Sequence, residues 1–560
     1  MERTSQPAPE RWRLKPGKIL WTLNVLALLA AAVCFRCRSL ENIPGTNGDE
    51  AWYGVVTLQM LTEGRFQLQT PTGNPLNWFF FGPLVLLHVF FPPSVALLRS
   101  VAVASGLVAL GVNWLLCRWV FDRRTATIST VVLAVLPINI AYSRFAWDAS
   151  QSLLATLPVV YFSLAAVRFH RQRRRFVVAA VLAQIAAILV HPTNVFTGVA
   201  VLAALATRLR RQDLQRFVPV SRLTRGAATA LIMAAVVLVS LTAYGMTASG
   251  VSRFLSRMGG AAELLRPQAA PHYAVLFPRL FTGGTTYSDV AGSESWWEWP
   301  CAEGRAGWGV DAVLFWIVVI AAAGFLWKSW KADRRMEDRV LISIWALALA
   351  AFLLLAGPSK MTPGWQRYAI CLVAPTVLLV ARGTTVFVAG LSPGRAGAAL
   401  VIVSLAGWLV LADFDAHYFR FIERTGGRGH LTFRTADVEP KRAALQTILQ
   451  HRHQDVVGGV AGDDATTWIV ASQWWNYWPI RYLSMAEKDV RVLTAEEAEA
   501  AAGHDSALRQ GRMWRVEFSN SRELRQARAA WDGREVRQWQ FEDYGTGKLL
   551  CVLHAVGDAE

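Results

Sequence analysis

Apolar runs of membrane length alternate with short polar or basic stretches from residue 19 to residue 412. Because a spanning helix needs about 20 apolar residues, this pattern predicts a polytopic α-helical membrane protein. Eleven spans are predicted, at residues 19–37, 94–117, 125–142, 151–167, 176–191, 195–207, 227–247, 311–327, 340–356, 367–381 and 398–412. A further apolar segment, Leu76–Phe91, is short and interrupted by proline, so it is predicted to lie flat at the membrane interface.

The basic residues indicate an orientation, because lysine and arginine in short loops favour the cytoplasmic side. With the basic N-terminus inside, every dense basic cluster between the predicted spans falls on the inner side. Two long outer loops result, 38–93 and 248–310. This agreement requires Leu76–Phe91 to be interfacial, since a span there would place the clusters at 118–124 and 168–175 on opposite sides.

The character of the chain changes after residue 413, which divides it into a membrane domain (1–413) and a C-terminal domain (414–560). The C-terminal part is charged and alternates between helical and strand patterns. The predicted elements are a helix at Val438–His453, a strand at Thr467–Ser472, a helix at Thr494–Ala502, a strand at Met513–Phe518, a helix at Arg522–Trp531 and a strand at Leu549–Val556. This alternation predicts a small α/β domain, and eleven spans from an inner start place it outside.

Composition excludes two other classes of protein. Hydrophobic residues make up 53% and charged residues 17% of the 560 residues, which excludes an ordinary soluble globule. The net charge of +17 is spread over short clusters and forms no continuous basic face, so no nucleic-acid partner is expected.

No Asn-x-Ser/Thr sequon occurs, which favours a bacterial or archaeal cytoplasmic membrane. No metal-ligand spacing predicts a metal site, and a Cys301–Cys551 disulfide is left open.

The predicted topology collects ionisable residues at the outer ends of spans, where charge is costly and is explained by pairing or by function. The acidic candidates for catalysis are Asp49, Glu50 and Asp148. The candidates for binding a substrate or a lipid phosphate are Arg99, Arg144, His191, His272, Lys360, Arg367 and Tyr368. Such a set suits group transfer: Asp49 could take a proton from an acceptor hydroxyl while guanidinium groups hold a phosphate leaving group.

Several candidates also have a structural interpretation. Asp49 follows a glycine and precedes a helical pattern, so it could serve only as an N-cap. Arg144 and Asp148 stand four residues apart and could form a local ion pair. His191-Pro192 could simply end a span, and Arg367-Tyr368 could anchor the chain at the interface.

Several motifs in fixed order resemble the GT-C superfamily of membrane glycosyltransferases, in particular the protein O-mannosyltransferases and the aminoarabinose transferase of lipid A. The resemblance covers roughly residues 15–380, and the order of the motifs is its specific part. The motifs are the acidic pair in the first outer loop, the interfacial segment, Leu98-Arg99-Ser100, Val120–Ala126, Leu136-Pro137, Tyr142-Ser143-Arg144 with Asp148, Gln366-Arg367-Tyr368 and Ala374-Pro375.

The resemblance implies inverting transfer of one sugar from a polyprenyl-phosphate carrier at the outer membrane–water interface, with no required metal or other cofactor. Residue by residue, Asp49 matches the catalytic carboxylate and Glu50 a supporting neighbour. Asp148 matches the second acidic position, and Arg144 and Arg367 would lie near the lipid phosphate. The implied partners are the lipid-linked donor, a lipid, glycan or protein acceptor, and membrane lipids.

Two segments depart from the patterns that they resemble. At Gly73-Asn74-Pro75-Leu76 the lipid A branch has a Glu-Lys-Pro-Pro-like stretch, and the missing lysine puts a lipid A acceptor in doubt. The stretch Gln473–Trp478 is similar to the Trp-Trp-Asp-Tyr-Gly signature of oligosaccharyltransferases, but Asn476 replaces the acid and no glycine follows. N-glycosylation is therefore disfavoured, although the stretch could still bind a saccharide or a partner.

Two further functions stay open beside glycosyl transfer. A transporter or flippase for lipid-linked sugars would have polar residues in the middle of its spans and inverted repeats, and the sequence has few of the former and no visible repeat. A catalytically inactive binding scaffold would keep the lipid site without turnover.

Overall fold

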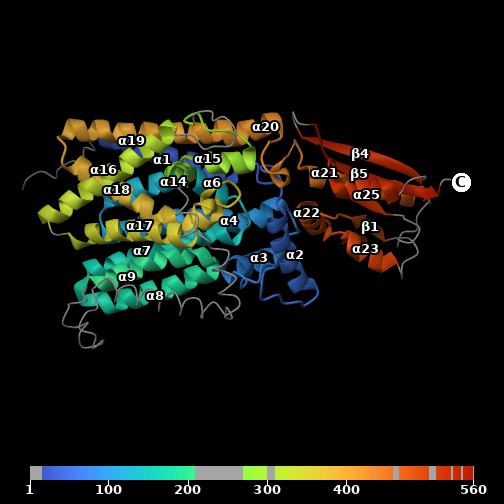
Figure 1. Cartoon of the computed structure of the whole chain (residues 1–560), viewed down its shortest axis with the longest axis horizontal. Coiled ribbons are helices and arrows are strands. Elements are labelled where there is room, and N and C mark those ends of the chain that lie inside the picture. Colours follow the sequence, from blue (N-terminus) through green and yellow to red (C-terminus); the bar gives the residue numbers. More distant parts are fainter. Residues whose placement is uncertain are drawn as a thin grey trace, which may run out of the picture.

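A bundle of long apolar helices occupies one end of the molecule, and a domain built on a β-sheet occupies the other (Figure 1). The structure is a computed structural model. It describes residues 16–207, 269–298, 309–333, 335–435, 437–457, 466–502, 513–530, 534–543 and 547–558.

The helix bundle contains seven described segments that are long and apolar enough to cross a membrane. They are Ile19–Cys37, Val95–Val120, Asp148–Arg168, Val310–Asp333, Met336–Leu355, Gln366–Ala389 and Pro393–Thr425. In terms of elements, they correspond to α1 (Pro16–Cys37), α4 (Val95–Val120), η1 (Asp148–Gln151) with α7 (Ser152–Arg168), α16 (Val310–Asp333), α17 (Met336–Leu355), η6 (Gln366–Leu372) with α18 (Val373–Ala389), and α19 (Pro393–Phe414) with its extension. These segments establish an integral membrane protein with a polytopic helical fold.

The other four predicted spans differ from this set. The segment 125–142 is broken into α5 (Arg123–Val135) and α6 (Pro137–Tyr142), because Leu136 precedes a proline and adopts an extended conformation. The predicted span 176–191 is α8 (Arg173–Val190), whose first turn carries three arginines. The segment 195–207 is divided between η3 (Pro192–Thr197) and α9 (Gly198–Ala206), and 227–247 lies outside the described residues. The count of eleven spans stays a prediction.

The described part of the predicted outer loop 248–310 is largely helical. It contains α14 (Ala269–Thr282), the short α15 (Gly284–Thr286) and η4 (Tyr287–Ala291). Helix α14 packs on α16, where the indole of Trp316 donates a hydrogen bond to the Ala274 carbonyl at 2.6 Å. His272 belongs to α14, but its side chain lies outside the described residues.

Ion pairs gather several helix ends at the end of the bundle away from the C-terminal domain. Arg382 on α18 bonds to Asp122 at 3.1 Å and to Asp338 at 2.9 Å. Arg168, at the end of α7, donates to the Val120 carbonyl, at the end of α4, at 2.6 Å. The predicted basic clusters at 118–124 and 168–175 therefore lie at the same end of the bundle.

The segment predicted to be interfacial, Leu76–Phe91, forms α3 (Trp78–Phe90), a helix of 13 residues. One side of α3 is buried, with Phe80 fully enclosed, whereas Leu86 and Phe90 are 60% and 69% exposed. A helix this short with an exposed apolar side is suited to lying at a membrane surface.

Helix α19 passes the predicted domain boundary at 413. It continues through η7 (Asp415–Arg420) into α20 (Phe421–Thr425), so the change to the C-terminal domain falls after Thr425. The sheet that follows has the strand order β2-β1-β3-β5-β4. Strand β1 pairs in parallel with β2 and β3, whereas β5 pairs antiparallel with β3 and β4.

The predicted alternation of elements in the C-terminal domain is confirmed in outline. The predicted elements correspond to α21 (Pro440–Val457), β1 (Thr467–Val470), α23 (Ala495–Ala502), β3 (Trp514–Phe518), α25 (Arg522–Ala530) and β5 (Gly547–Asp558). Among the described residues, the elements that were not predicted include the short η8 (Leu431–Phe433), α22 (Trp474–Ser484), β2 (Val490–Leu493) and β4 (Arg534–Asp543). The proposed disulfide cannot be followed, because Cys301 lies outside the described residues.

Candidate active site

The first polar segment after α1 becomes the start of α2 (Gly48–Thr62). Asn47 caps this helix: its side-chain oxygen accepts the backbone N–H of Asp49 at 2.7 Å, and its own N–H donates to Glu50 Oε2 at 3.1 Å. Asp49 is therefore the second helical residue, and the interpretation of Asp49 as an N-cap is wrong. Its carboxylate is left available for other contacts.

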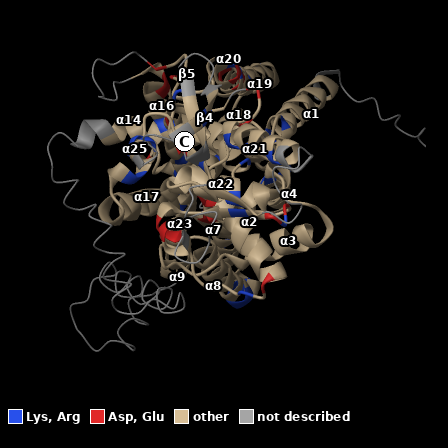
Figure 2. Cartoon of the chain, turned by 90° about the vertical axis from the view of Figure 1, so that its right-hand side faces the viewer, with Lys and Arg blue, Asp and Glu red and all other residues tan. Residues whose placement is uncertain are grey.

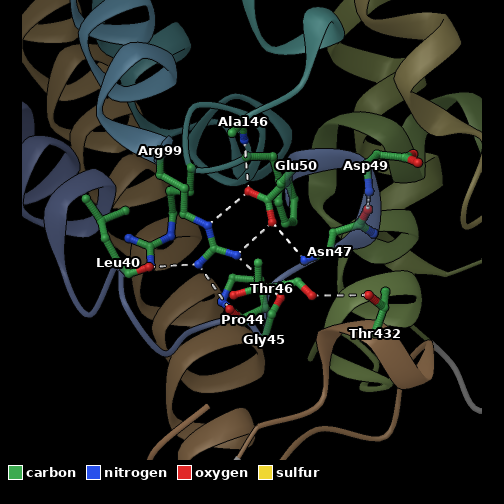
Figure 3. A network of polar contacts seen from close by, with 12 residues as sticks. Leu40, Pro44, Gly45, Thr46, Asn47, Asp49, Glu50, Arg99, Ala146 and Thr432 are labelled. Carbon is green, nitrogen blue, oxygen red and sulfur yellow. Dashed lines mark hydrogen bonds and ion pairs between the residues drawn. The ribbon is translucent and has the colours of Figure 1, made fainter. Parts of the chain in front are cut away.

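Glu50 and Arg99 form a fully buried bidentate ion pair (Figure 3). Arg99 donates from Nε to Glu50 Oε1 at 2.9 Å and from Nη2 to Oε2 at 2.8 Å. Its remaining N–H groups donate to the carbonyls of Leu40, Pro44 and Gly45. Since arginine has five N–H donors, this set uses all of them.

The acceptor sites of Glu50 are also filled. Besides the two bonds from Arg99, its carboxylate accepts the N–H of Asn47 at 3.1 Å and the N–H of Ala146 at 2.9 Å. The pair thus links the loop before α2, the start of α4 and the segment after α6. We call this buried set of hydrogen bonds the Glu50–Arg99 network. This geometry gives the predicted catalytic Glu50 and the predicted ligand Arg99 a structural role.

Arg144 is likewise buried within the protein. It donates to the carbonyls of Phe35 at 2.6 Å and Ile43 at 2.7 Å, and its guanidinium lies 4.8 Å from the centre of the Phe419 ring. The local ion pair with Asp148 is not formed. Arg144 instead fastens the end of α1 to the loop that follows.

Asp49 points away from the Glu50–Arg99 network (Figure 3) and is half-buried. The indole N–H of Trp474 donates to Asp49 Oδ1 at 2.9 Å, and within the described residues Oδ2 has no hydrogen-bond partner. Burial raises the pKa of Asp49; Arg367 and the Trp474 indole oppose this rise, while Asp148 adds to it. The site therefore presents a carboxylate with one free oxygen and a raised proton affinity.

Arg367 is the cation that faces this carboxylate. It lies in η6, is half-buried, and interacts electrostatically with Asp49 and Asp148. Its guanidinium lies 5.3 Å from the Trp147 ring and 5.2 Å from the Tyr368 ring. Within the described structure, it donates a hydrogen bond to the Gly364 carbonyl at 3.2 Å. In contrast to Arg99 and Arg144, Arg367 is held mainly by rings and charges.

The other candidates surround Arg367. Asp148 begins η1 and is half-buried. His191 ends α8, where its Nδ1 bonds to the Thr193 hydroxyl at 2.7 Å, and its ring lies 5.6 Å from that of Tyr368. The Lys360 ammonium lies 4.2 Å from the Trp365 ring. Asp49, Asp148, His191, Lys360, Arg367 and Tyr368 thus form one cluster.

Two residues of this cluster were missed by sequence reasoning. Asp289 in η4 accepts the side-chain N–H of Gln366 at 2.9 Å and interacts with Arg367; burial raises its pKa. No motif marks Asp289 in the sequence. Trp474 belongs to the aromatic stretch Gln473–Trp478, which was considered as a saccharide- or partner-binding surface and not as part of the site of Asp49. In the described part of the chain, no group of three or more His, Cys, Asp or Glu residues is placed to hold a metal ion.

No family model matches the chain, and no curated protein matches it in sequence. Among solved structures, it is similar to ArnT from Cupriavidus metallidurans in the apo state, with 13% identity over 95% of this chain and 98% of that chain and a TM-score of 0.48. The same protein bound to undecaprenyl phosphate matches with 12% identity over 96% and 97% of the chains and a TM-score of 0.46. The oligosaccharyltransferase of Archaeoglobus fulgidus in the apo form matches with 13% identity over 90% of this chain and 70% of that chain and a TM-score of 0.47.

Proposed function

We propose that the protein is a membrane glycosyltransferase that moves a single sugar from a polyprenyl-phosphate donor to an acceptor hydroxyl at the outer face of the membrane. The observation that carries this proposal is the contrast between two adjacent carboxylates. Glu50 is saturated with donors, whereas Asp49 keeps one free oxygen in a half-buried position facing Arg367.

Asp49 is suited to act as the general base. It accepts the proton of the acceptor hydroxyl while the hydroxyl oxygen forms a bond to the anomeric carbon. The bond from that carbon to the phosphate oxygen breaks, and polyprenyl phosphate leaves with the electron pair. Attack from the face opposite the phosphate inverts the anomeric centre. A base with a raised pKa is better matched to this proton transfer near neutral pH than an ordinary aspartate.

Arg367 is assigned to the phosphate of the leaving group. Its guanidinium lies among aromatic rings and has charged neighbours but few hydrogen bonds, so it can turn its donors toward a phosphate. Asp148, His191, Lys360 and Tyr368 surround the same place and are assigned to substrate binding. Glu50, Arg99 and Arg144 are assigned to the scaffold behind it.

A donor panel tests this assignment. The purified full chain is supplied with undecaprenyl phosphate linked to mannose, glucose, galactose or aminoarabinose, together with a cell-envelope extract as acceptor, and released undecaprenyl phosphate is measured. We expect turnover with one donor, its loss in Asp49→Asn, and wild-type turnover in the matched control Glu63→Gln, whose carboxylate is exposed at the far end of α2. Turnover retained by Asp49→Asn would refute the assignment, and binding of the carrier without turnover of any donor would support the scaffold alternative.

A further inference from the structure

Helix α22 of the C-terminal domain lies along α2 of the membrane domain, as both Figure 1 and Figure 2 show. At Gly48, an added Cβ would lie 2.5 Å from the carbonyl oxygen of Trp474 and 2.6 Å from its Cδ1. At Gly54, an added Cβ would lie 2.5 Å from the ring of Tyr482. Two glycines of α2 thus allow the C-terminal domain to sit directly on the helix that carries Asp49.

The far end of this contact is fastened independently. The hydroxyl of Tyr482 lies 3.0 Å from His88 Nε2 on α3 and 3.1 Å from the Ser94 carbonyl before α4. Trp474 therefore lies on a helix whose other end is fixed to α3 and to the residue before α4. This attachment holds the indole N–H beside Asp49.

Resting on the function proposed above, we infer that Trp474 is a positioning residue for that reaction: its indole N–H holds one oxygen of Asp49 and leaves the other free for the acceptor hydroxyl. Indole N–H is a donor that cannot accept a proton, so it orients the carboxylate without competing for the proton that Asp49 takes. The site is then complete only when the C-terminal domain is seated.

Other groups also act on the Asp49 carboxylate, and the test must separate them. Arg367 in η6 stabilises its negative charge, whereas Asp148 in η1 and Glu50 on α2 disfavour that charge. None of these groups changes when Trp474 is replaced by phenylalanine, which keeps an aromatic ring in the contact, removes the N–H donor and is smaller than the indole. Trp475→Phe is the matched control, because Trp475 is the next residue of α22 and packs on His430, with ring centres 5.0 Å apart.

The experiment measures protonation of Asp49 directly and needs no sugar donor. The full chain in detergent is pulsed with a water-soluble carbodiimide and glycine methyl ester at a series of pH values. Because the carbodiimide reacts with the protonated carboxyl group, labelling falls as the pH rises through the pKa. Mass spectrometry with fragmentation of the tryptic peptide 39–65 locates the label, and the exposed Glu63 in the same peptide is the internal reference.

A hydrogen bond to the charged form lowers a pKa, so losing it shifts the labelling midpoint of Asp49 upward. We expect a shift of about one pH unit in Trp474→Phe, with the Glu63 midpoint unchanged and Trp475→Phe like wild type. Gly48→Ala adds a methyl group on α2 that displaces Trp474 and so removes its hydrogen bond to Asp49. This variant should therefore give the same shift in the Asp49 midpoint. With an active donor, Trp474→Phe should lower kcat about tenfold and leave the KM for the donor unchanged.

An Asp49 midpoint in Trp474→Phe equal to that in Trp475→Phe would overturn the inference. That outcome is distinct from failure of the proposed function, which would appear as transfer retained by Asp49→Asn even with a shifted midpoint in Trp474→Phe.

Discussion

Replacing Glu50 by glutamine tests whether this carboxylate is structural, in contrast to the proposed catalytic Asp49. Each oxygen of Glu50 accepts two hydrogen bonds: Oε1 from Arg99 Nε and Ala146 N, and Oε2 from Arg99 Nη2 and Asn47 N. A glutamine must present its NH2 group at one of these two positions. In either orientation, that group meets two N–H donors and makes no hydrogen bond with them.

The cost of Glu50→Gln follows from this arrangement. Both members of the ion pair have fully buried side chains, so water can neither replace the lost bonds nor screen the Arg99 charge. Breaking one partner of a buried pair costs about 3–5 kcal/mol. By contrast, Asp49→Asn keeps an oxygen for the Trp474 indole and removes a charge whose burial is unfavourable, so we expect a change in stability within about 0.5 kcal/mol.

The free energy of unfolding is measured by denaturant titration in mixed micelles, with tryptophan fluorescence as the signal. We expect Glu50→Gln to lose stability, and Asp49→Asn to keep its stability while losing transfer. Arg65→Gln is the control, because Arg65 forms an exposed pair with Glu63 at 3.2 Å and such pairs contribute little. A Glu50→Gln protein as stable as wild type would refute the argument above, because the buried pair would then contribute nothing to stability.

Three further predictions concern other parts of the molecule. Arg367→Lys keeps the charge but loses the planar fork, so we expect weaker binding of undecaprenyl phosphate, measured by competition with a labelled carrier, and little change in stability. Gly54→Ala adds a methyl group against Tyr482 and should cost about 1–3 kcal/mol in the same unfolding assay, whereas Gly111→Ala, which meets open space on α4, should cost nothing. Burial raises the pKa of Glu517 to about 7, above its usual value near 4.5, so its contribution to stability is lost as the pH rises between these values; Glu517→Gln should be more stable than wild type at pH 8 by about 2–3 kcal/mol and equal to it at pH 4.

Much of the fold could be predicted because local patterns determine it. The apolar run at 94–117 became α4, and the strand pattern at Met513–Phe518 became β3. The elements that were missed depend on features that compete with these patterns. The helix α22 was not predicted because its sequence is rich in aromatic residues and contains Pro479. The apolar run 125–142 was predicted as one span, but Pro137 divides it into two helices.

The site was predicted in part for a similar reason. Asp49 and Arg367 could be selected because each stands where a polar segment meets an apolar run. The division of roles could not be selected, because it depends on contacts between residues far apart in sequence. The partner of Glu50 is 49 residues away on α4, and the partner of Asp49 is 425 residues away on α22.

Adjacent carboxylates on a helix cannot both face one site, because successive side chains point about 100° apart around the axis. The buried pair with Arg99 fixes the rotation of α2 about its own axis, since the Glu50 side chain must point toward Arg99. Asp49 is then turned toward the Trp474 indole, which donates to it, and toward the charge of Arg367. The structural carboxylate therefore sets the orientation of the proposed catalytic one, so weakening the Glu50–Arg99 network should impair transfer through the orientation of Asp49 even where the protein remains folded.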